Sequence, residues 1–293
     1  MSRKNFYKGN RVFYTLVYII TIFAFCITLY PFLYIISVSF SSSHSVYKGD
    51  VFLFPVNPTI AGYKQVFAQK GLWTAYGNTI LYTVCGTLLN IVITLIGAFP
   101  LSQKRFCARK FFNFCVAFTM YFSAGMIPSY VLITSLGLYN TRWVMLLPSL
   151  VSTYNLMVCR SAFSAIPEEL SESAAIDGAN DIQYFLRIAI WLITPTLAVI
   201  TLYYAVAHWN SYMPALLYLS KEDLMPMQVL LRRVLIQASN EMLDGVVDSA
   251  DKEAASIQIR YVTIVVATLP VLTIYPLLQK YFVKGVMLGA VKG

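Results

Sequence analysis

The sequence predicts an all-α protein that crosses a membrane several times. Hydrophobic residues make up 58% of the 293 residues, charged residues only 12%, and the mean hydropathy is +0.65. Soluble globular domains carry about a quarter charged residues. The apolar residues also gather in runs long enough for a helix to cross a hydrocarbon core of about 30 Å. These observations together indicate a polytopic membrane protein.

The net charge of +9 arises from basic residues that cluster in short segments beside apolar runs. Membrane topology explains such clusters better than nucleic-acid binding does, so no nucleic-acid partner is expected. The five cysteines show no CxxC spacing and predict neither a disulfide framework nor a metal site. No cleavable signal peptide is evident, because the first apolar run is too long for one.

Six spans are predicted, with both ends of the chain in the cytoplasm. The N-terminal segment 1–12 and the turn 102–110 each carry four Lys or Arg residues, which places both segments inside by the positive-inside rule. Gly125 and Pro128 predict a kink or break within the third span. The spans, which together form a membrane domain over residues 13–283, are expected at about 13–40, 79–101, 111–136, 143–163, 184–209 and 261–282.

Two longer connections are expected on the outer side. Residues 41–76 are rich in Ser, Pro and Gly, with one short helix predicted near 61–67. The loop 210–260 contains an apolar series at helical spacing, which predicts an amphipathic helix. This helix packs on the membrane domain or also receives an external partner. The series comprises Met227, Leu230, Leu231, Val234, Leu235, Ala238 and Met242.

A short acidic helix is predicted over residues 167–178, on the cytoplasmic side. Pro167 suits a first helical position, and two glutamates follow in the first turn, where carboxylates complement the helix dipole. Gly178 supplies a left-handed residue that ends the helix, and Asn180 or Asp181 can cap the next one. The pattern itself also allows an ordinary loop helix.

The segment Glu172-Ser173-Ala174, followed by three residues and Gly178, resembles the "EAA" loop of permease subunits of ATP-binding-cassette importers. Ile188 falls where that pattern has its isoleucine, whereas Ser173 replaces an alanine and Ile190-Trp191 stand in place of Leu-Pro. The resemblance implies a coupling helix that docks into a groove of an ATPase subunit. The coupling residues that it implies are Glu168, Glu169, Glu172, Ser173, Ala174, Asp177 and Gly178.

Further stretches resemble carbohydrate-importer permeases of the maltose-transporter type, in the branch that serves complex oligosaccharides. The matching stretches are residues 29–32, 125–130, 135–141, 205–211, 279–285 and 289–293. This resemblance implies a type I importer permease fold in a bacterial cell membrane and import by ATP-driven alternating access. It implies as partners a second homologous permease, two ATP-binding subunits, an extracytoplasmic solute-binding protein and an oligosaccharide.

The resemblance also implies that ATP and Mg²⁺ bind to the partner subunits, with no cofactor on this chain. The cytoplasmic tail 284–293 is expected to reach the ATPase interface through its last residues. These are Gly289, Ala290, Val291, Lys292 and Gly293.

All thirteen Asp and Glu residues lie outside the predicted spans, and the sequence contains no G-x-x-x-x-G-K-[ST] phosphate loop. Carriers driven by ion gradients usually place ionisable groups at membrane depth. No catalytic residues are predicted, and His44 and His208 are expected to be interfacial polar residues rather than bases. A channel or secondary carrier that works without ATPases is the alternative.

Polar and aromatic side chains at membrane depth are the candidates for a substrate path, because hydrogen bonds and aromatic faces hold sugars. Each candidate has a structural alternative, since Tyr and Trp form interfacial belts and Asn joins helices. The candidates are Asn90, Tyr121, Tyr154, Asn155, Tyr204, Trp209 and Asn210.

Overall fold

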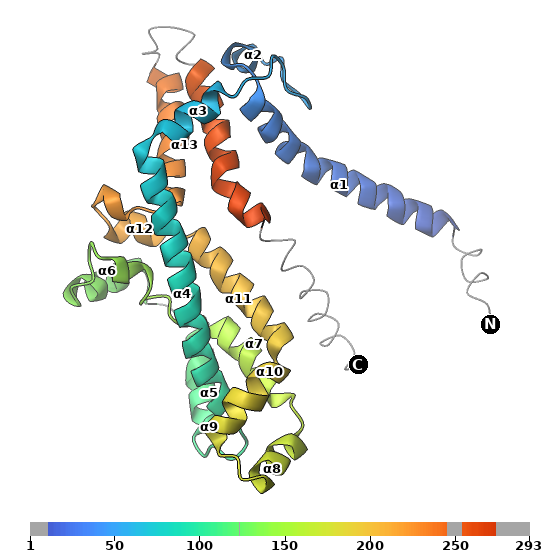
Figure 1. The fold of residues 1–293 in the computed structure, drawn as a ribbon, viewed down its shortest axis with the longest axis vertical. Coiled ribbons are helices and arrows are strands. Elements are labelled where there is room, and N and C mark those ends of the chain that lie inside the picture. The colour runs from blue at the N-terminus through green and yellow to red at the C-terminus, as the bar shows by residue number, and fades with distance from the viewer. Residues whose placement is uncertain (1–10, 123, 245–253, 274–293) are drawn as a thin grey trace. The chain divides into compact units, whose positions relative to one another are not determined.

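A computed structural model describes residues 11–122, 124–244 and 254–273. Every regular element in these ranges is a helix, as the sequence predicts (Figure 1). The chain divides into two compact units. Unit 1 comprises residues 1–69 and 231–268, and unit 2 comprises residues 70–230 and 269–293.

Unit 1 contains α1 (Arg11–Phe40), α2 (Ser43–Tyr47), α3 (Ala61–Ala68) and, up to residue 268, the last described helix, Ala254–Thr273. Gln258 ties this last helix to the segment after α1. Its amide Nε2 donates to the Ser41 carbonyl at 2.6 Å, and its Oε1 accepts from the Ser43 hydroxyl at 2.7 Å. Gly62 lets α3 approach closely, because a Cβ there would lie 3.1 Å from both Gln258 and Val262.

The helix α1 is apolar on all sides, and none of its most apolar stretch is buried within the chain. Pro31 lies inside it without ending it. A helix that is hydrophobic all round is stable only against lipid or against other protein. This helix is therefore suited to a membrane environment.

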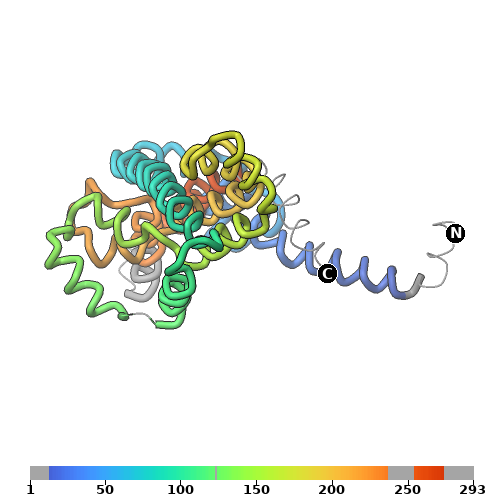
Figure 2. Tube along the Cα trace, turned by 90° about the horizontal axis from the view of Figure 1, so that it is seen from below, coloured from blue at the N-terminus to red at the C-terminus, as the bar shows by residue number. Residues whose placement is uncertain are grey.

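Unit 2 is built around the long helix α4 (Lys70–Ser102), which packs against α7 (Thr153–Ser164) and α11 (Thr194–Trp209). The two views show these helices next to one another (Figure 1, Figure 2). Their shared core includes Leu95 and Phe99 of α4, Phe163 of α7 and Ile200 of α11.

The other elements of unit 2 are short. They are α5 (Arg109–Phe118), α6 (Met126–Ser135), a 3₁₀ turn (Arg142–Met145), α8 (Glu168–Ile176), α9 (Asp181–Tyr184), a π-helix (Phe185–Ala189), α10 (Ile190–Leu192), α12 (Met213–Tyr218) and a second 3₁₀ turn (Glu222–Leu224). The amphipathic helix α13 (Met227–Asp244) follows, within the predicted loop 210–260, and from residue 231 onward it belongs to unit 1.

The helix α4 begins at Lys70 rather than at about 79. The Asn78 amide donates to the carbonyls of Asp223 and Met225, at 2.7 and 3.2 Å, and the Tyr82 hydroxyl donates to that of Leu224 at 2.8 Å. These tertiary hydrogen bonds hold the N-terminal part of α4 against residues 223–225.

The predicted third and fourth spans are not continuous helices. In the third, α5 and α6 are separated around Gly125, whose φ is +81°. In the fourth, helix begins only at Thr153, after Pro148, and the Ser152 hydroxyl accepts from the Asn155 amide at 3.4 Å. Proline removes a backbone donor and a serine cap starts a new helix, so this region folds as a turn and a short helix.

Three described helices are long and apolar enough to cross a membrane, namely Phe13–Phe40, Lys70–Ser102 and Ala254–Thr273. The pair Asp181–Leu192 and Thr194–Trp209, bent by 81°, can form a fourth. The division into six spans therefore stays a prediction. The last helix begins at Ala254, before the expected start near 261, and the end of that span lies outside the described residues.

Candidate functional site

The acidic helix α8 has defined signals at both ends. Glu168 and Glu169 lie in its first turn, although Pro167 serves as the cap rather than as the first helical residue. At the other end Gly178 adopts a φ of +81°, and the next amide, Ala179, donates to the Ala174 carbonyl at 2.9 Å. This hydrogen bond crosses a left-handed residue, a conformation in which glycine carries no steric cost.

The chain restarts as a helix immediately after this stop. The Asn180 side-chain oxygen accepts from the Gln183 backbone amide at 2.9 Å. The Gln183 side-chain oxygen accepts from the Asn180 backbone amide at 3.0 Å. This reciprocal capping box satisfies two amides that the new helix would otherwise leave unpaired. The connection from α8 to α9 therefore has a specified geometry.

One face of α8 is anchored and the other is open. Ala174 is 6% exposed and belongs to the core formed by α4, α7 and α11. On the open side Glu169, Glu172, Ser173 and Asp177 are exposed, and the side chain of Ile176 is 86% exposed. Exposed carboxylates near the exposed Ile176 side chain suit a protein partner with a basic rim.

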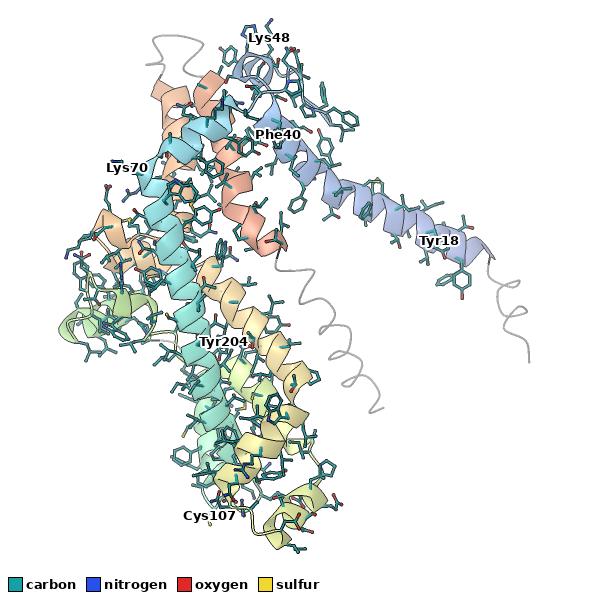
Figure 3. All side chains as sticks on the ribbon, in the orientation of Figure 1. Tyr18, Phe40, Lys48, Lys70, Cys107 and Tyr204 are labelled. Carbon is teal, nitrogen blue, oxygen red and sulfur yellow. The ribbon has the colours of Figure 1, made fainter. Side chains whose placement is uncertain are left out.

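The basic turn 102–110 meets α8 and α9 at the same end of unit 2. Lys104 Nζ lies 2.8 Å from a Glu168 carboxylate oxygen, and Arg105 forms an ion pair with Asp181. Cys107 of this turn lies at the α8 end of the unit (Figure 3). Glu169, Glu172 and Asp177 form no ion pair with any residue in the described ranges, so their charges remain available.

Two of the predicted substrate-path residues join α4 to α11. Asn90 is 1% exposed, and its amide donates to the Ser149 carbonyl at 2.5 Å while its Oδ1 lies 2.6 Å from His208 Nε2. The Tyr204 hydroxyl lies 2.7 Å from the Thr94 hydroxyl and accepts from the Ser152 amide at 3.1 Å. Figure 3 shows Tyr204 on α11, facing this interface.

His208 is thus 7% exposed and buried at the contact between α4 and α11, a burial that the prediction of an interfacial polar residue did not include. Gly86 on α4 makes room for its ring, since a Cβ at Gly86 would lie 2.5 Å from two atoms of the imidazole. Tyr204 and His208 are four residues apart on α11, as are Asn90 and Thr94 on α4. This matched spacing is the sequence signal that could have identified the pair of polar faces.

A cavity of about 510 Å³ opens beside this interface. Tyr204 and His208 form part of its wall, together with the serines Ser129, Ser149, Ser152 and Ser211 and several aliphatic side chains. A ligand pocket of ordinary size falls within about 300 to 1,000 Å³. The hydroxyl groups can hydrogen-bond to a sugar, and the apolar and tyrosine side chains can pack against its ring.

The remaining candidates are dispersed. Tyr121 is 84% exposed and Tyr154 is also exposed, whereas Asn155 is buried within α7. Trp209 is buried with its ring edge-on to Tyr76, and the Asn210 side chain lies 3.5 Å from the Gln228 amide nitrogen. None of these five lines the cavity.

Two further predictions concern other parts of the chain. The proposed tail contacts, Gly289 to Gly293, lie outside the described residues. Within the described residues, no group of three or more His, Cys, Asp or Glu side chains could hold a metal ion.

The membrane-length apolar helices of the described residues define an integral membrane protein, and comparison with known proteins gives its class. A family profile described as "Binding-protein-dependent transport system inner membrane component" matches residues 4–288. The chain belongs to this family, which confirms the predicted membership of the binding-protein-dependent importer permeases.

Two relatives from Bacillus subtilis (strain 168) cover nearly the same length. The polygalacturonan/rhamnogalacturonan transport system permease protein YtcP is 37% identical over 97% of this chain and 99% of its own length. Protein LplC is 40% identical over 91% of this chain and 90% of its own.

A solved structure of a bacterial ABC transporter involved in the import of the acidic polysaccharide alginate contains a similar chain. It superposes with a TM-score of 0.85 at 35% identity, covering 94% of this chain and 98% of that one. This likeness confirms the predicted importer permease fold.

Proposed function

We propose that this chain is the permease subunit of an ATP-driven importer and forms half of the translocation path for an oligosaccharide. The observation that carries the proposal is the two-sided character of α8. Its inner face is anchored in the helical core through Ala174, and its outer face presents free carboxylates and an exposed Ile176. Such a helix can receive force from a partner and pass it to the spans.

The proposed mechanism is alternating access. Two ATPase subunits bind ATP and Mg²⁺, close on each other and move the α8 helices of two related permeases. Because Ala174 belongs to the same buried cluster as residues of α4, α7 and α11, movement of α8 is passed on to these helices through that cluster. The cavity then opens toward an extracytoplasmic binding protein, and hydrolysis restores the inward-facing state. No catalytic step takes place on this chain.

The proposed partners are those of a complete importer in a bacterial cell membrane. They are a second homologous permease, two ATP-binding subunits and a solute-binding protein outside the membrane. The family description and a related alginate transporter with a "periplasmic protein" bound to an alginate pentasaccharide support the last of these. The tail residues 289–293 are proposed to contact the ATPases as well.

An acidic oligosaccharide is the substrate class that we would test first. One relative is named for polygalacturonan and rhamnogalacturonan, and a structural neighbour imports the acidic polysaccharide alginate. The predicted spans of this chain contain no Asp or Glu that would repel an anion. Competition of oligouronates and neutral oligosaccharides for uptake by the complete transporter would decide between the two classes.

The coupling role of α8 is tested by copurification of this chain with its sister permease and ATPase. Glu172→Lys reverses a free charge on the open face and should weaken the association with the ATPase. Asp50→Lys is the control, because it also reverses an exposed carboxylate but lies in the 41–76 connection, which is expected on the outer side. An intact complex with Glu172→Lys would show that docking occurs elsewhere.

The alternative is a channel or secondary carrier that needs no ATPase. Uptake measured after depletion of ATP, with ion gradients kept intact, separates the two mechanisms. Uptake that stops supports the importer. Uptake that continues at its usual rate would replace it with the carrier.

A further inference from the structure

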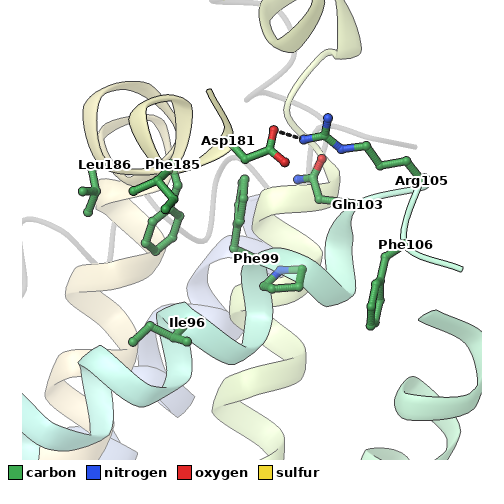
Figure 4. Close-up of a pocket in the computed structure, with 10 residues that line it drawn as sticks. Ile96, Phe99, Gln103, Arg105, Phe106, Asp181, Phe185 and Leu186 are labelled. Carbon is green, nitrogen blue, oxygen red and sulfur yellow. Dashed lines mark hydrogen bonds and ion pairs between the residues drawn. The ribbon is translucent and has the colours of Figure 1, made fainter. Parts of the chain in front are cut away.

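A second cavity, of about 650 Å³, lies at the end of unit 2 where the apolar part of α4 gives way to the basic turn. Its walls are the side chains of Ile96, Phe99, Pro100, Ile182, Phe185 and Leu186. Figure 4 shows Phe99 and Ile96 from α4 on one side and Phe185 and Leu186 on the other. The interior of this cavity is therefore suited to hydrocarbon.

The rim of the same cavity is polar. Gln103, Arg105 and Asp181 line it, and the ion pair between Arg105 and Asp181 crosses its edge (Figure 4). Lys104, Arg109 and Lys110 lie in the same stretch of sequence, so the rim belongs to a positively charged segment. By the positive-inside rule this segment faces the cytoplasmic leaflet, whose surface is negatively charged.

The ion pair at the rim is exchangeable. The side chains of Arg105 and Asp181 are 60% and 65% exposed. An ion pair so open to solvent contributes little to stability. Arg105 can therefore pair with another anion without disrupting the fold. A phosphate accepts two hydrogen bonds from a guanidinium, as a carboxylate does.

We propose that this cavity binds an anionic phospholipid of the cytoplasmic leaflet, with an acyl chain between α4 and the Ile182–Leu186 segment and the phosphate at Arg105. A free phosphate would leave the apolar walls unused, and a neutral lipid would leave the basic rim unused. Only an amphiphile with a negative headgroup matches both parts of the site.

The position of the site links lipid binding to coupling. Asp181 lies three residues after Gly178, directly beyond the end of α8, and Lys104 next to Arg105 pairs with Glu168 at its start. A headgroup that takes Arg105 from Asp181 loosens one of the two ion pairs that hold the α8 region to the basic turn. Anionic lipid therefore adjusts how firmly the coupling segment is held.

The test is native mass spectrometry of the complete transporter complex that contains this chain. The complex is purified in detergent and mixed with phosphatidylglycerol or with phosphatidylcholine of the same acyl chains, and the lipid that stays bound is measured. The wild type should retain phosphatidylglycerol preferentially. Arg105→Gln should reduce that retention about fivefold, the effect of one basic residue near an anionic surface. Leu186→Trp, which fills the cavity, should also reduce it, whereas Lys221→Gln on an exposed loop should not.

Asp181→Asn separates lipid binding from a structural role of the ion pair. If Arg105 serves the lipid, this variant frees the guanidinium and retention should rise. If the ion pair only stabilises the fold, Asp181→Asn and Arg105→Gln should change the retention of phosphatidylglycerol in the same way. Equal retention of the two lipids by the wild type, or displacement of phosphatidylglycerol by sn-glycerol-1-phosphate, would overturn the proposal.

Discussion

At the scale of single residues, the contact between α4 and α11 depends on buried polar side chains that satisfy one another. Asn90 uses both ends of its amide, one toward Ser149 and one toward His208. Tyr204 likewise bridges Thr94 and the Ser152 amide. Interhelical hydrogen bonds of this kind specify which faces meet, because a mismatched face would leave polar atoms unpaired.

The first prediction concerns Gly86, which accommodates His208. Gly86→Ala places a Cβ about 2.5 Å from the imidazole, so the ring must move away from Asn90. Overpacking of this kind destabilises by about 1–3 kcal/mol, and the lost hydrogen bond adds to it. Thermal unfolding of the detergent-purified chain should show a clear decrease in the midpoint.

Gly77→Ala is the matched control for this prediction. Gly77 lies on the same helix as Gly86, and a Cβ there would meet nothing within 4 Å. It should leave the unfolding midpoint unchanged or raise it, since alanine favours helix. Equal midpoints for the two variants would mean that the close approach of His208 to α4 does not contribute to stability.

Some residues of the site could be recognised from local pattern and others could not. Gly178 and Asn180 act on backbone groups within three residues of themselves, so spacing alone predicts their conformation and hydrogen bonds. His208 interacts with Asn90, which is 118 residues away in sequence, and its burial depends on how two helices pack. The sequence places it near a span end. The four-residue spacing on each helix can mark a polar face, but it does not show that these two faces meet.

At the scale of elements, the orientation of α8 relative to α9 depends on where α8 ends. Gly178 has a φ of +81°, a conformation that proline cannot adopt because its ring holds φ near −65°. The reversal at Gly178 sets the direction in which α9 leaves α8. A change there alters the angle between α8 and α9 while leaving the longer helices themselves intact.

The second prediction follows from this geometry. Gly178→Pro should reduce transport by the complete importer to background while membrane insertion stays normal, and Gly178→Asn should retain most of it because asparagine tolerates the left-handed region. Uptake and membrane content of the two variants provide the measurement. Normal uptake with proline would contradict the role of α8 in coupling.

The breaks in the helices were less predictable than the helices themselves. Gly125 and Pro128 predict an interruption in the third span, and the structure has one at Gly125. The turn before Thr153 follows Pro148, and the 81° bend between Leu192 and Thr194 immediately precedes Pro195, so each has a local signal that hydropathy does not record. The π-helix at Phe185–Ala189 has no such signal. Hydropathy does not distinguish a straight helix from a bent one, because the bend depends on tertiary packing.

At the scale of the whole molecule, orientation in the membrane decides whether α8 can meet an ATPase. The basic turn 102–110 and α8 are joined by the ion pair of Lys104 with Glu168, and Arg105 pairs with Asp181 just beyond α8. They must therefore lie on the same side. Any measurement that locates the turn also locates α8.

The third prediction uses Cys107, an exposed native cysteine of this turn. In a variant that lacks the other four cysteines, a membrane-impermeant maleimide should leave Cys107 unlabelled in intact cells and label it in inside-out vesicles. A cysteine introduced at the exposed Ser220, in the loop expected outside, should show the opposite pattern. Labelling of Cys107 from outside would place α8 outside as well. No cytoplasmic ATPase could then reach it, and the importer mechanism would give way to a carrier without ATPases.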